Sequence, residues 1–234
     1  MNTVGEAAQQ ALSLVATGDP KLVGIVLLSL RVSLAAVVLG ALVGLPLGAA
    51  VAVNEFRGKR AVIVTLNALM GLPSVVVGLC VYLLLSRAGP LGSWGILFTP
   101  TAMIIAQTIL IAPTLAALTR QVVADGWNEY REQLRSLGET RLGAATTLLW
   151  ELRFSLVTIL LAGFGRAASE VGAVMIVGGN IDGVTRVMTT TIALETSKGD
   201  LPLALALGLI LLAIVLAVNA GAHIVKEAAQ HRYG

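Results

Sequence analysis

The sequence has little of what most soluble functional sites are made from. It holds one cysteine, Cys80, and two histidines, His223 and His231, among 234 residues. One cysteine excludes an intramolecular disulfide, and two histidines do not indicate a histidine-based metal centre. Cys80 lies in an apolar stretch, so we expect a small buried side chain without reactive chemistry. Aromatic residues make up 4% of the chain, which argues against stacking platforms for bases or sugars.

Charge is also scarce. Charged residues make up 12% of the chain, against about 25% in soluble domains. Hydrophobic residues make up 56% and the mean hydropathy is +0.88, so a soluble globular domain and a disordered chain are both excluded. The net charge is +3 and no lysine- or arginine-rich run occurs, so the pI of 9.4 does not indicate binding to nucleic acid.

Five apolar stretches are long enough to cross a lipid bilayer, since a spanning helix needs about 20 mostly apolar residues. The first contains Arg31 and is longer than a membrane is thick, so its span proper is expected from about residue 30. The sequence therefore predicts an all-α, polytopic membrane protein with five transmembrane helices, forming one domain over residues 1–234. The stretches run roughly over 22–53, 61–86, 96–119, 154–177 and 201–225.

The lysines and arginines predict the orientation, because cytoplasmic loops carry an excess of them. Ten lie in the loops 54–60 and 120–153 and after residue 225, against four in the opposite loops. This places the N-terminus outside and the C-terminus in the cytoplasm. The first 20 residues contain no lysine or arginine, so no cleavable signal peptide is expected.

The cytoplasmic loop 120–153 is polar and helix-prone, and Gly138 interrupts it. We expect two short helices that meet at a tight turn around this glycine. Such a helix pair could present a rigid projection to a soluble partner. A solvated connection stabilised by charge pairs explains the same composition.

Two charged residues fall inside the fourth apolar stretch. Arg166 and Glu170 are four residues apart, which predicts neighbours on one helix face. Charges within a span are costly, by about 2.5–3.5 kcal/mol each on insertion scales, and therefore tend to pair. We favour a structural ion pair in the bundle over a direct functional role.

The second apolar stretch contains residues that shape helix packing. Pro73 removes a backbone hydrogen bond and is expected to kink the helix, while Gly71 and Gly78 would let another helix approach closely. Ser74, Thr108 and Thr189 place hydroxyl groups in or beside the apolar stretches, although no motif assigns them a role.

An outer loop follows the fourth stretch and begins Gly178-Gly179-Asn180. Glycine permits backbone conformations that are closed to other residues. Exposed backbone N–H groups in such turns, with Thr185 and Arg186 nearby, could attract an anion. A plain exposed turn is the alternative interpretation.

The cytoplasmic loop resembles that of the permease subunits of ATP-binding-cassette (ABC) importers. Their signature reads Glu-Ala-Ala, three residues, Gly, nine residues, then Ile-x-Leu-Pro. Aligned on Gly138, its glutamate falls on Glu132, whereas Gln133 and Leu134 replace the alanines and Glu151 replaces the proline. The resemblance implies a coupling site for an ATPase within 129–141, formed by Glu132, Leu137, Gly138 and Arg141.

Other stretches resemble oxyanion permeases of this family, over about residues 25–220. The sequence Gly-Leu-Pro-Ser-Val-Val-Val-Gly at 71–78 is most similar to tungstate permeases, as are the segments 86–92 and 193–200. A further pattern, spread over the fourth stretch and the outer loop, is typical of molybdate-type permeases. Its positions are Phe164, Arg166, Glu170, Gly172, Ala173, Asn180, Ile181, Gly183, Thr185 and Arg186.

The resemblance implies a homodimer in a bacterial-type plasma (inner) membrane that carries tungstate into the cytoplasm. A separate ABC ATPase would hold the ATP, and an extracytoplasmic oxyanion-binding protein would deliver the substrate. No Walker-type phosphate-binding motif occurs, so this chain is expected to be no enzyme and to hold no cofactor or metal. The translocation path or bundle core is expected to include Pro73, Ser74, Gly78, Arg166, Glu170 and Gly172. Hydroxyl groups are the expected contacts for the oxyanion, and Ser74, Thr108 and Thr189 are the candidates.

Three alternatives to a tungstate permease follow from the same sequence. The first is a molybdate or sulfate permease with the same mechanism. The second is a channel or carrier that needs no ATPase. The third is a membrane scaffold without a substrate.

Overall fold

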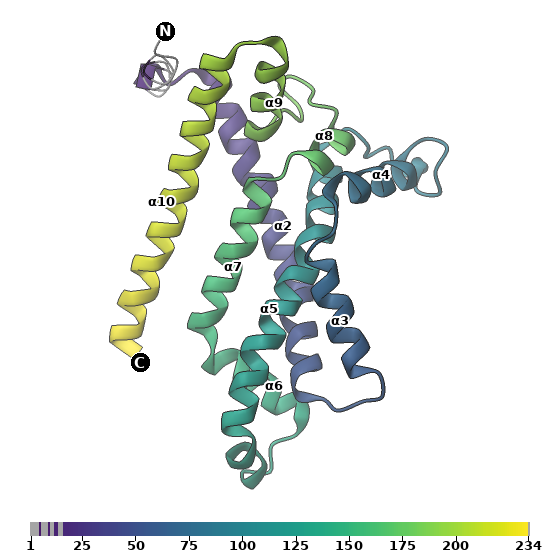
Figure 1. The fold of residues 1–234 in the computed structure, drawn as a ribbon, viewed down its shortest axis with the longest axis vertical. Coiled ribbons are helices and arrows are strands. Elements are labelled where there is room, and N and C mark those ends of the chain that lie inside the picture. The colour runs from purple at the N-terminus through teal and green to yellow at the C-terminus, as the bar shows by residue number, and fades with distance from the viewer. Residues whose placement is uncertain (1–4, 6–8, 10–11, 14–15, 234) are drawn as a thin grey trace. The chain divides into compact units, whose positions relative to one another are not determined.

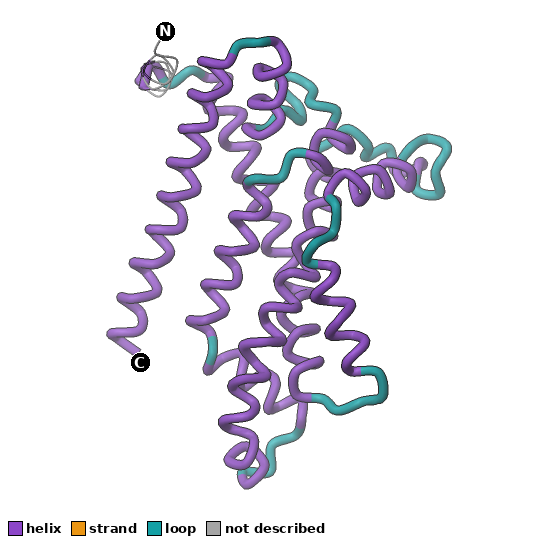
Figure 2. The backbone as a smooth tube through the Cα atoms, in the orientation of Figure 1, coloured by secondary structure: helices purple, strands orange, loops and turns teal. Residues whose placement is uncertain are grey.

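The computed structural model describes residues 5, 9, 12, 13 and 16–233, with the backbone alone for 229–233. Helices connected by short loops make up this part of the chain, and it contains no strand (Figures 1 and 2). The all-α prediction is therefore confirmed. The elements are α2 (Pro20–Val53), α3 (Lys59–Leu69), α4 (Ser74–Leu85), η1 (Gly92–Trp94), α5 (Pro100–Ser136), α6 (Arg141–Glu151), α7 (Arg153–Ala168), α8 (Gly172–Gly178), α9 (Met188–Lys198) and α10 (Leu201–Tyr233).

Three helices are long and apolar enough to cross a membrane singly. They are α2, α5 and the part of α10 from Leu201 to Ala228. Two further pairs, α3 with α4 and α6 with α7, are apolar enough together but are broken by a sharp bend. Within the described residues, length and composition thus give three spans, or up to five if each bent pair counts as one.

The predicted span 61–86 is not one helix. The chain leaves the helix after Leu69, and Gly71 N and Leu72 N donate to the carbonyl oxygens of Ala68 and Leu69. Pro73 then stands at the N-cap of α4 with extended backbone angles. A proline disfavours helical backbone at the residue before it but suits the start of a helix, which explains the break. The expectation that Pro73 lies inside a kinked helix is thus wrong.

The predicted span 154–177 is also divided. α7 ends at Ala168 and α8 begins at Gly172, so Glu170 lies in the connection between them. Its Oε1 accepts a hydrogen bond from Ala173 N at 3.0 Å, in the first turn of α8. A carboxylate is stabilised there by the free N–H groups of the helix start. The prediction that Arg166 and Glu170 share a helix face is therefore wrong.

The chain forms two compact units. Unit 1 comprises residues 1–35, 73–107 and 167–221, and unit 2 comprises residues 36–72, 108–166 and 222–234. The helices α2, α5, α7 and α10 each contribute residues to both units. The assignment of 1–234 as one domain stays a prediction.

In unit 2, α2 and α5 pack through their backbones. Three glycines, Gly40, Gly44 and Gly48, recur every four residues along α2. A Cβ at Gly44 would lie 2.8 Å from Ala112 O, and a Cβ at Gly48 would overlap Ala116 O. Small residues at this spacing let membrane helices approach closely, and this signal was present in the sequence.

In unit 1, α4 packs against α8. A Cβ at Gly78 would lie 2.7 Å from Ala173 Cα, which confirms the expected close approach. Gly71, by contrast, would meet only Ala68 O of its own preceding turn, so the same expectation for Gly71 is wrong. The buried residues of α4 recur at Val77, Val81 and Leu85 along one stripe.

Cys80 does not lie on the buried stripe of α4. It is exposed in this chain, so the expectation of a buried thiol is wrong. Its exposed neighbours are apolar, because α4 is hydrophobic on all sides and only one side packs within the chain. These neighbours are Val75, Val76, Leu79, Leu83 and Leu84.

The start of α9 forms a second packing centre in unit 1. Met188 is 1% exposed and packs with Leu22 of α2 and Leu207 of α10. Its backbone N–H donates to Ser29 Oγ on α2 at 2.8 Å. The N–H groups in the first turn of a helix lack acceptors within that helix. The Ser29 hydroxyl supplies such an acceptor for α9.

Candidate functional site

The turn between α5 and α6 has the geometry that the sequence predicts around Gly138. Gly138 adopts φ +74°, its N–H donates to Arg135 O, and Glu139 N donates to Leu134 O, both at 3.0 Å. A Cβ on Gly138 would meet nothing within 4 Å, so the backbone conformation rather than crowding favours glycine. The tight turn is confirmed, but its first helix is the end of the 37-residue α5 rather than a short helix.

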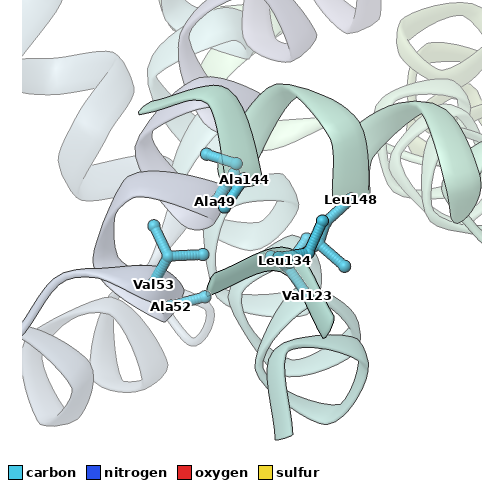
Figure 3. Packing of buried hydrophobic residues seen from close by; sticks show 8 residues of the cluster. Ala49, Ala52, Val53, Val123, Leu134, Ala144 and Leu148 are labelled. Carbon is cyan, nitrogen blue, oxygen red and sulfur yellow. The ribbon is translucent and has the colours of Figure 1, made fainter. Parts of the chain in front are cut away.

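The second helix of this turn begins at a defined cap. Thr140 Oγ1 accepts a hydrogen bond from Gly143 N at 3.1 Å. Figure 3 shows the buried cluster beneath the turn, to which α2, α5 and α6 all contribute. The turn is therefore fixed to the ends of two long helices. The cluster contains Ala49, Ala52, Val53, Val123, Leu134, Ala144, Ala145 and Leu148.

Apolar side chains stand exposed beside this turn. Leu137 is 73% exposed and Leu142 is 77% exposed, and the two flank Gly138. Glu132, Gly138 and Arg141 are also exposed, so the predicted coupling residues all lie at the surface. Leu142 was missed by sequence reasoning, although an isolated leucine in a polar segment was a usable signal. An exposed apolar pair among charged residues suits a protein-binding surface.

An ion pair lies close to the start of α6. Lys59 Nζ lies 2.9 Å from Glu55 Oε1 and donates to Ala52 O at 3.0 Å. The Lys59 hydrogen bond and charge lower the pKa of Glu55, and the nearby charge of Arg141 lowers it further. The stabilisation is present above the ordinary pKa of the carboxyl group and is lost as the pH falls through the lowered value. Glu55 is solvent-exposed, so the effect is small.

The outer loop between α8 and α9 is organised from within. Thr185 is fully buried, and its Oγ1 donates to Gly178 O at 2.6 Å and accepts from Ile181 N at 2.9 Å. Arg186 forms an ion pair with Asp182 at 3.0 Å. The Thr185 hydroxyl therefore makes its hydrogen bonds inside the loop. Thr185 positions the loop and is not a surface contact for an anion.

Left-handed backbone conformations occur at three positions of the outer loop. Gly179, Asn180 and Gly183 have φ values of +70°, +49° and +71°. The Nη2 of Arg186 lies 3.5 Å from Asn180 O, so this arginine faces the first turn of the loop. The sequence prediction of unusual backbone geometry in this loop is confirmed for Gly179 and Asn180.

The sequence places the chain in a known family of transport proteins. The sequence pattern of the family described as "binding-protein-dependent transport system inner membrane component" matches residues 44–232. The chain belongs to this family. Family membership makes it a multi-pass, non-enzymatic subunit of the inner membrane that works with an ATPase and a binding protein.

Three relatives of this inner membrane component cover most of its length. The tungstate uptake system permease protein TupB of Peptoclostridium acidaminophilum is 44% identical over 97% of this chain and 100% of the relative. TupB of Campylobacter jejuni is 38% identical over 74% of this chain and 72% of the relative. A Haloferax volcanii protein named "Probable anion ABC transporter permease protein" is 48% identical over 85% of this chain and 88% of the relative.

The remaining residues that were predicted for the translocation path or bundle core are divided between the two units. In unit 1, Ser74 begins α4 and faces the start of α8, because a Cβ at Gly172 would lie 2.9 Å from Ser74 Oγ. Thr189 is 8% exposed and donates to Glu170 O at 2.7 Å. Arg166 and Thr108 belong to unit 2. The described residues include no cluster of histidine, cysteine or carboxylates suited to a metal ion.

The Thr185 hydroxyl offers a direct test of how the outer loop of the permease component is held. We expect Thr185→Val to destabilise the loop by about 1–3 kcal/mol, because it keeps the shape but leaves buried polar groups unpaired. Amide hydrogen exchange of residues 178–187 should accelerate accordingly. Thr185→Ser retains the hydroxyl and serves as the matched control. Equal exchange rates in both variants would show that the hydroxyl does not hold the loop.

Proposed function

We propose that this chain is the tungstate permease of an ABC importer. The relatives named as tungstate uptake permeases, at 44% and 38% identity, support the choice of substrate. In this proposal two copies form a homodimer with one pathway between them, with the N-termini outside and the C-termini in the cytoplasm. An extracytoplasmic binding protein delivers the oxyanion, and a separate ATPase binds and hydrolyses ATP.

The observation that carries the coupling mechanism is the geometry of the α5–α6 turn. Its backbone is fixed by Gly138 and by the cap at Thr140, while Leu137 and Leu142 remain exposed. A surface of this kind can enter a groove of the ATPase and transmit force without deforming. We therefore assign ATPase docking to residues 129–141 together with Leu142.

The buried cluster explains how movement of the ATPase would reach the membrane. Leu134 of α5 and Leu148 of α6 belong to the same buried cluster as Val53 at the end of α2. Closure of the ATPases on ATP would pull these packed elements as one body and open the outer side. Hydrolysis would reset the arrangement, so that two packings of the same bundle alternate.

The path itself should bind the oxyanion weakly. A dianion held by several cations in a low-dielectric pathway would be trapped there, because unscreened attraction grows as the dielectric constant falls. High affinity is then a property of the separate binding protein. Small and hydroxyl-bearing side chains, such as Ser74 and Thr108, suit this passage.

Metal accumulation in cells tests the proposal. Cells with and without this chain, each with the native partner subunits, receive equal trace amounts of tungstate and molybdate. We expect elemental mass spectrometry to find chain-dependent tungsten uptake that excess molybdate barely suppresses. Equal or preferred molybdenum uptake would transfer the proposal to molybdate, and no uptake of either would refute oxyanion transport.

A strain that lacks the ATPase subunit is the matched control. Tungsten uptake should fall to the level of cells without the permease chain. Uptake that persists in this strain would instead identify a channel or carrier that works without ATP.

A further inference from the structure

A small cavity with both polar and apolar lining lies within unit 1. It is formed by residues of α2, α5, α9 and the connection between α7 and α8. Its volume is about 10 Å³ for the centre of a water-sized molecule. A volume of about 10–15 Å³ on this measure is what one water molecule requires. The polar lining residues are Ser29, Ser33, Gln107, Glu170 and Thr189.

Gln107 is the feature that points to a ligand. Its side chain is 3% exposed, and Nε2 donates to Ala167 O at 3.1 Å. A carbonyl oxygen can accept only from a donor, so this contact identifies the amide nitrogen and fixes the other end as Oε1. Oε1 has no hydrogen-bond partner among the described residues, and buried acceptors in folded proteins are nearly always paired.

The other polar groups offer mostly acceptors. Thr189 Oγ1 donates its hydrogen to Glu170 O, and Ser29 Oγ donates its hydrogen to Ile25 O. Both hydroxyl hydrogens are thus committed. Ser29 Oγ also accepts from Met188 N, whereas Thr189 Oγ1 keeps its lone pairs, and Ser33 adds a hydroxyl that can donate or accept. Glu170 adds a carboxylate, of which Oε1 already accepts from Ala173 N. A cavity rich in acceptors calls for a ligand with hydrogens to donate.

The charge of the cavity lining decides between an anion and a neutral ligand. The lining contains one carboxylate, Glu170, and no lysine or arginine. An oxyanion such as tungstate would meet the carboxylate and the Gln107 Oε1 lone pairs, which repel it. A water molecule carries two hydrogens, fits the volume and needs two to four polar partners.

We propose that this cavity is a binding site for one water molecule. The water donates one hydrogen to Gln107 Oε1 and the other to the Glu170 carboxylate. It joins α5 to the connection before α8 and holds Glu170 at the first turn of α8. The site is a structural hydration site and not a contact point for the transported anion, so it stands independently of the proposed function.

Radiolytic hydroxyl-radical labelling of the purified, membrane-embedded protein tests the site, because a bound water produces radicals where it sits. Val174 and Val187 line the cavity and are 1% and 5% exposed. Met103 is 0% exposed, does not line the cavity and reacts more readily with radicals, so it is the internal reference. We expect at least threefold more labelling of the two valines than of Met103.

Two variants remove the water by different routes. Gln107→Leu keeps the approximate volume but removes the acceptor, and Ser33→Val fills the cavity while leaving Gln107 and its bond to Ala167 in place. We expect labelling of the valines to fall to the Met103 level in each variant that remains folded. Valine labelling no greater than that of Met103 in the unaltered protein, or unchanged labelling in both variants, would overturn the proposal.

An exchange of salt distinguishes water from a bound cation. Labelling is repeated with sodium and with choline at equal ionic strength. Equal labelling of the valines in the two salts supports the water. Labelling that disappears in sodium would mean that a cation displaces the water, and the proposal would fail.

Discussion

Replacing Leu137 by aspartate is expected to weaken binding of the ATPase subunit by about 30-fold or more. Leu137 is 73% exposed on the fixed α5–α6 turn, so its large apolar surface is available to a partner. Truncating a central apolar anchor costs about 2 kcal/mol or more at protein interfaces, and about 1.4 kcal/mol corresponds to tenfold. A buried unpaired carboxylate adds to that cost. Affinity can be measured with the purified permease and ATPase in lipid nanodiscs.

A control for added charge is Gln121→Glu. Gln121 is exposed on α5, four turns before Leu137, so the variant adds the same charge to the same helix away from the turn. It should bind the ATPase normally. Unimpaired ATPase binding by Leu137→Asp would remove the docking assignment, provided that the variant is inserted and folded.

Substituting Gly48 by alanine is expected to destabilise the fold by about 1–3 kcal/mol or more, the usual cost of overpacking. The new methyl group would overlap Ala116 O and lie 2.9 Å from Arg120 N and from Thr119 Cβ. Two of these atoms belong to the α5 backbone, which cannot rotate away as a side chain can. The melting temperature in detergent should fall by about 2–4 °C for each kcal/mol in a protein of this size.

The matched control is Gly208→Ala in α10. Gly208 also lies within a helix, but a Cβ there would meet nothing within 4 Å. Alanine in place of a helical glycine is worth about 0.5–1 kcal/mol, so this variant should melt at the same temperature or slightly higher. Equal melting temperatures for the two variants would contradict the close packing of α2 on α5.

Features that depend on local sequence could be predicted. Apolar length gives α2, α10 and the first part of α5, because each contains a long apolar segment with few charges. The continuation of α5 through the charged residues 120–136 was not predicted. The turn at Gly138 follows from a glycine between two polar, helix-prone segments, and the structure gives it the left-handed conformation. The exposure of the coupling residues follows from their place in a polar loop.

Features that depend on distant contacts could not be predicted. Glu170 lies outside a helix, and its carboxylate accepts a hydrogen bond from Ala173 N. The four-residue spacing of Arg166 and Glu170 predicts a shared helix face and gives no sign of this hydrogen bond. Pro73 marks the start of α4, and the sequence alone did not distinguish this helix start from a kink within one helix. Gln107 was overlooked although it is an isolated amide in an apolar run, and its burial became visible only with Ala167 beside it.

The exposed position of Cys80 on α4 has a practical consequence for spectroscopy. Cys80 is the single cysteine of the chain, so a thiol-specific nitroxide or fluorophore attaches at one known place without any mutation. Because the side chain points away from the stripe that packs on α8, the label leaves that packing intact. The unmodified protein thus carries its own attachment point for reporting how α4 moves during a transport cycle.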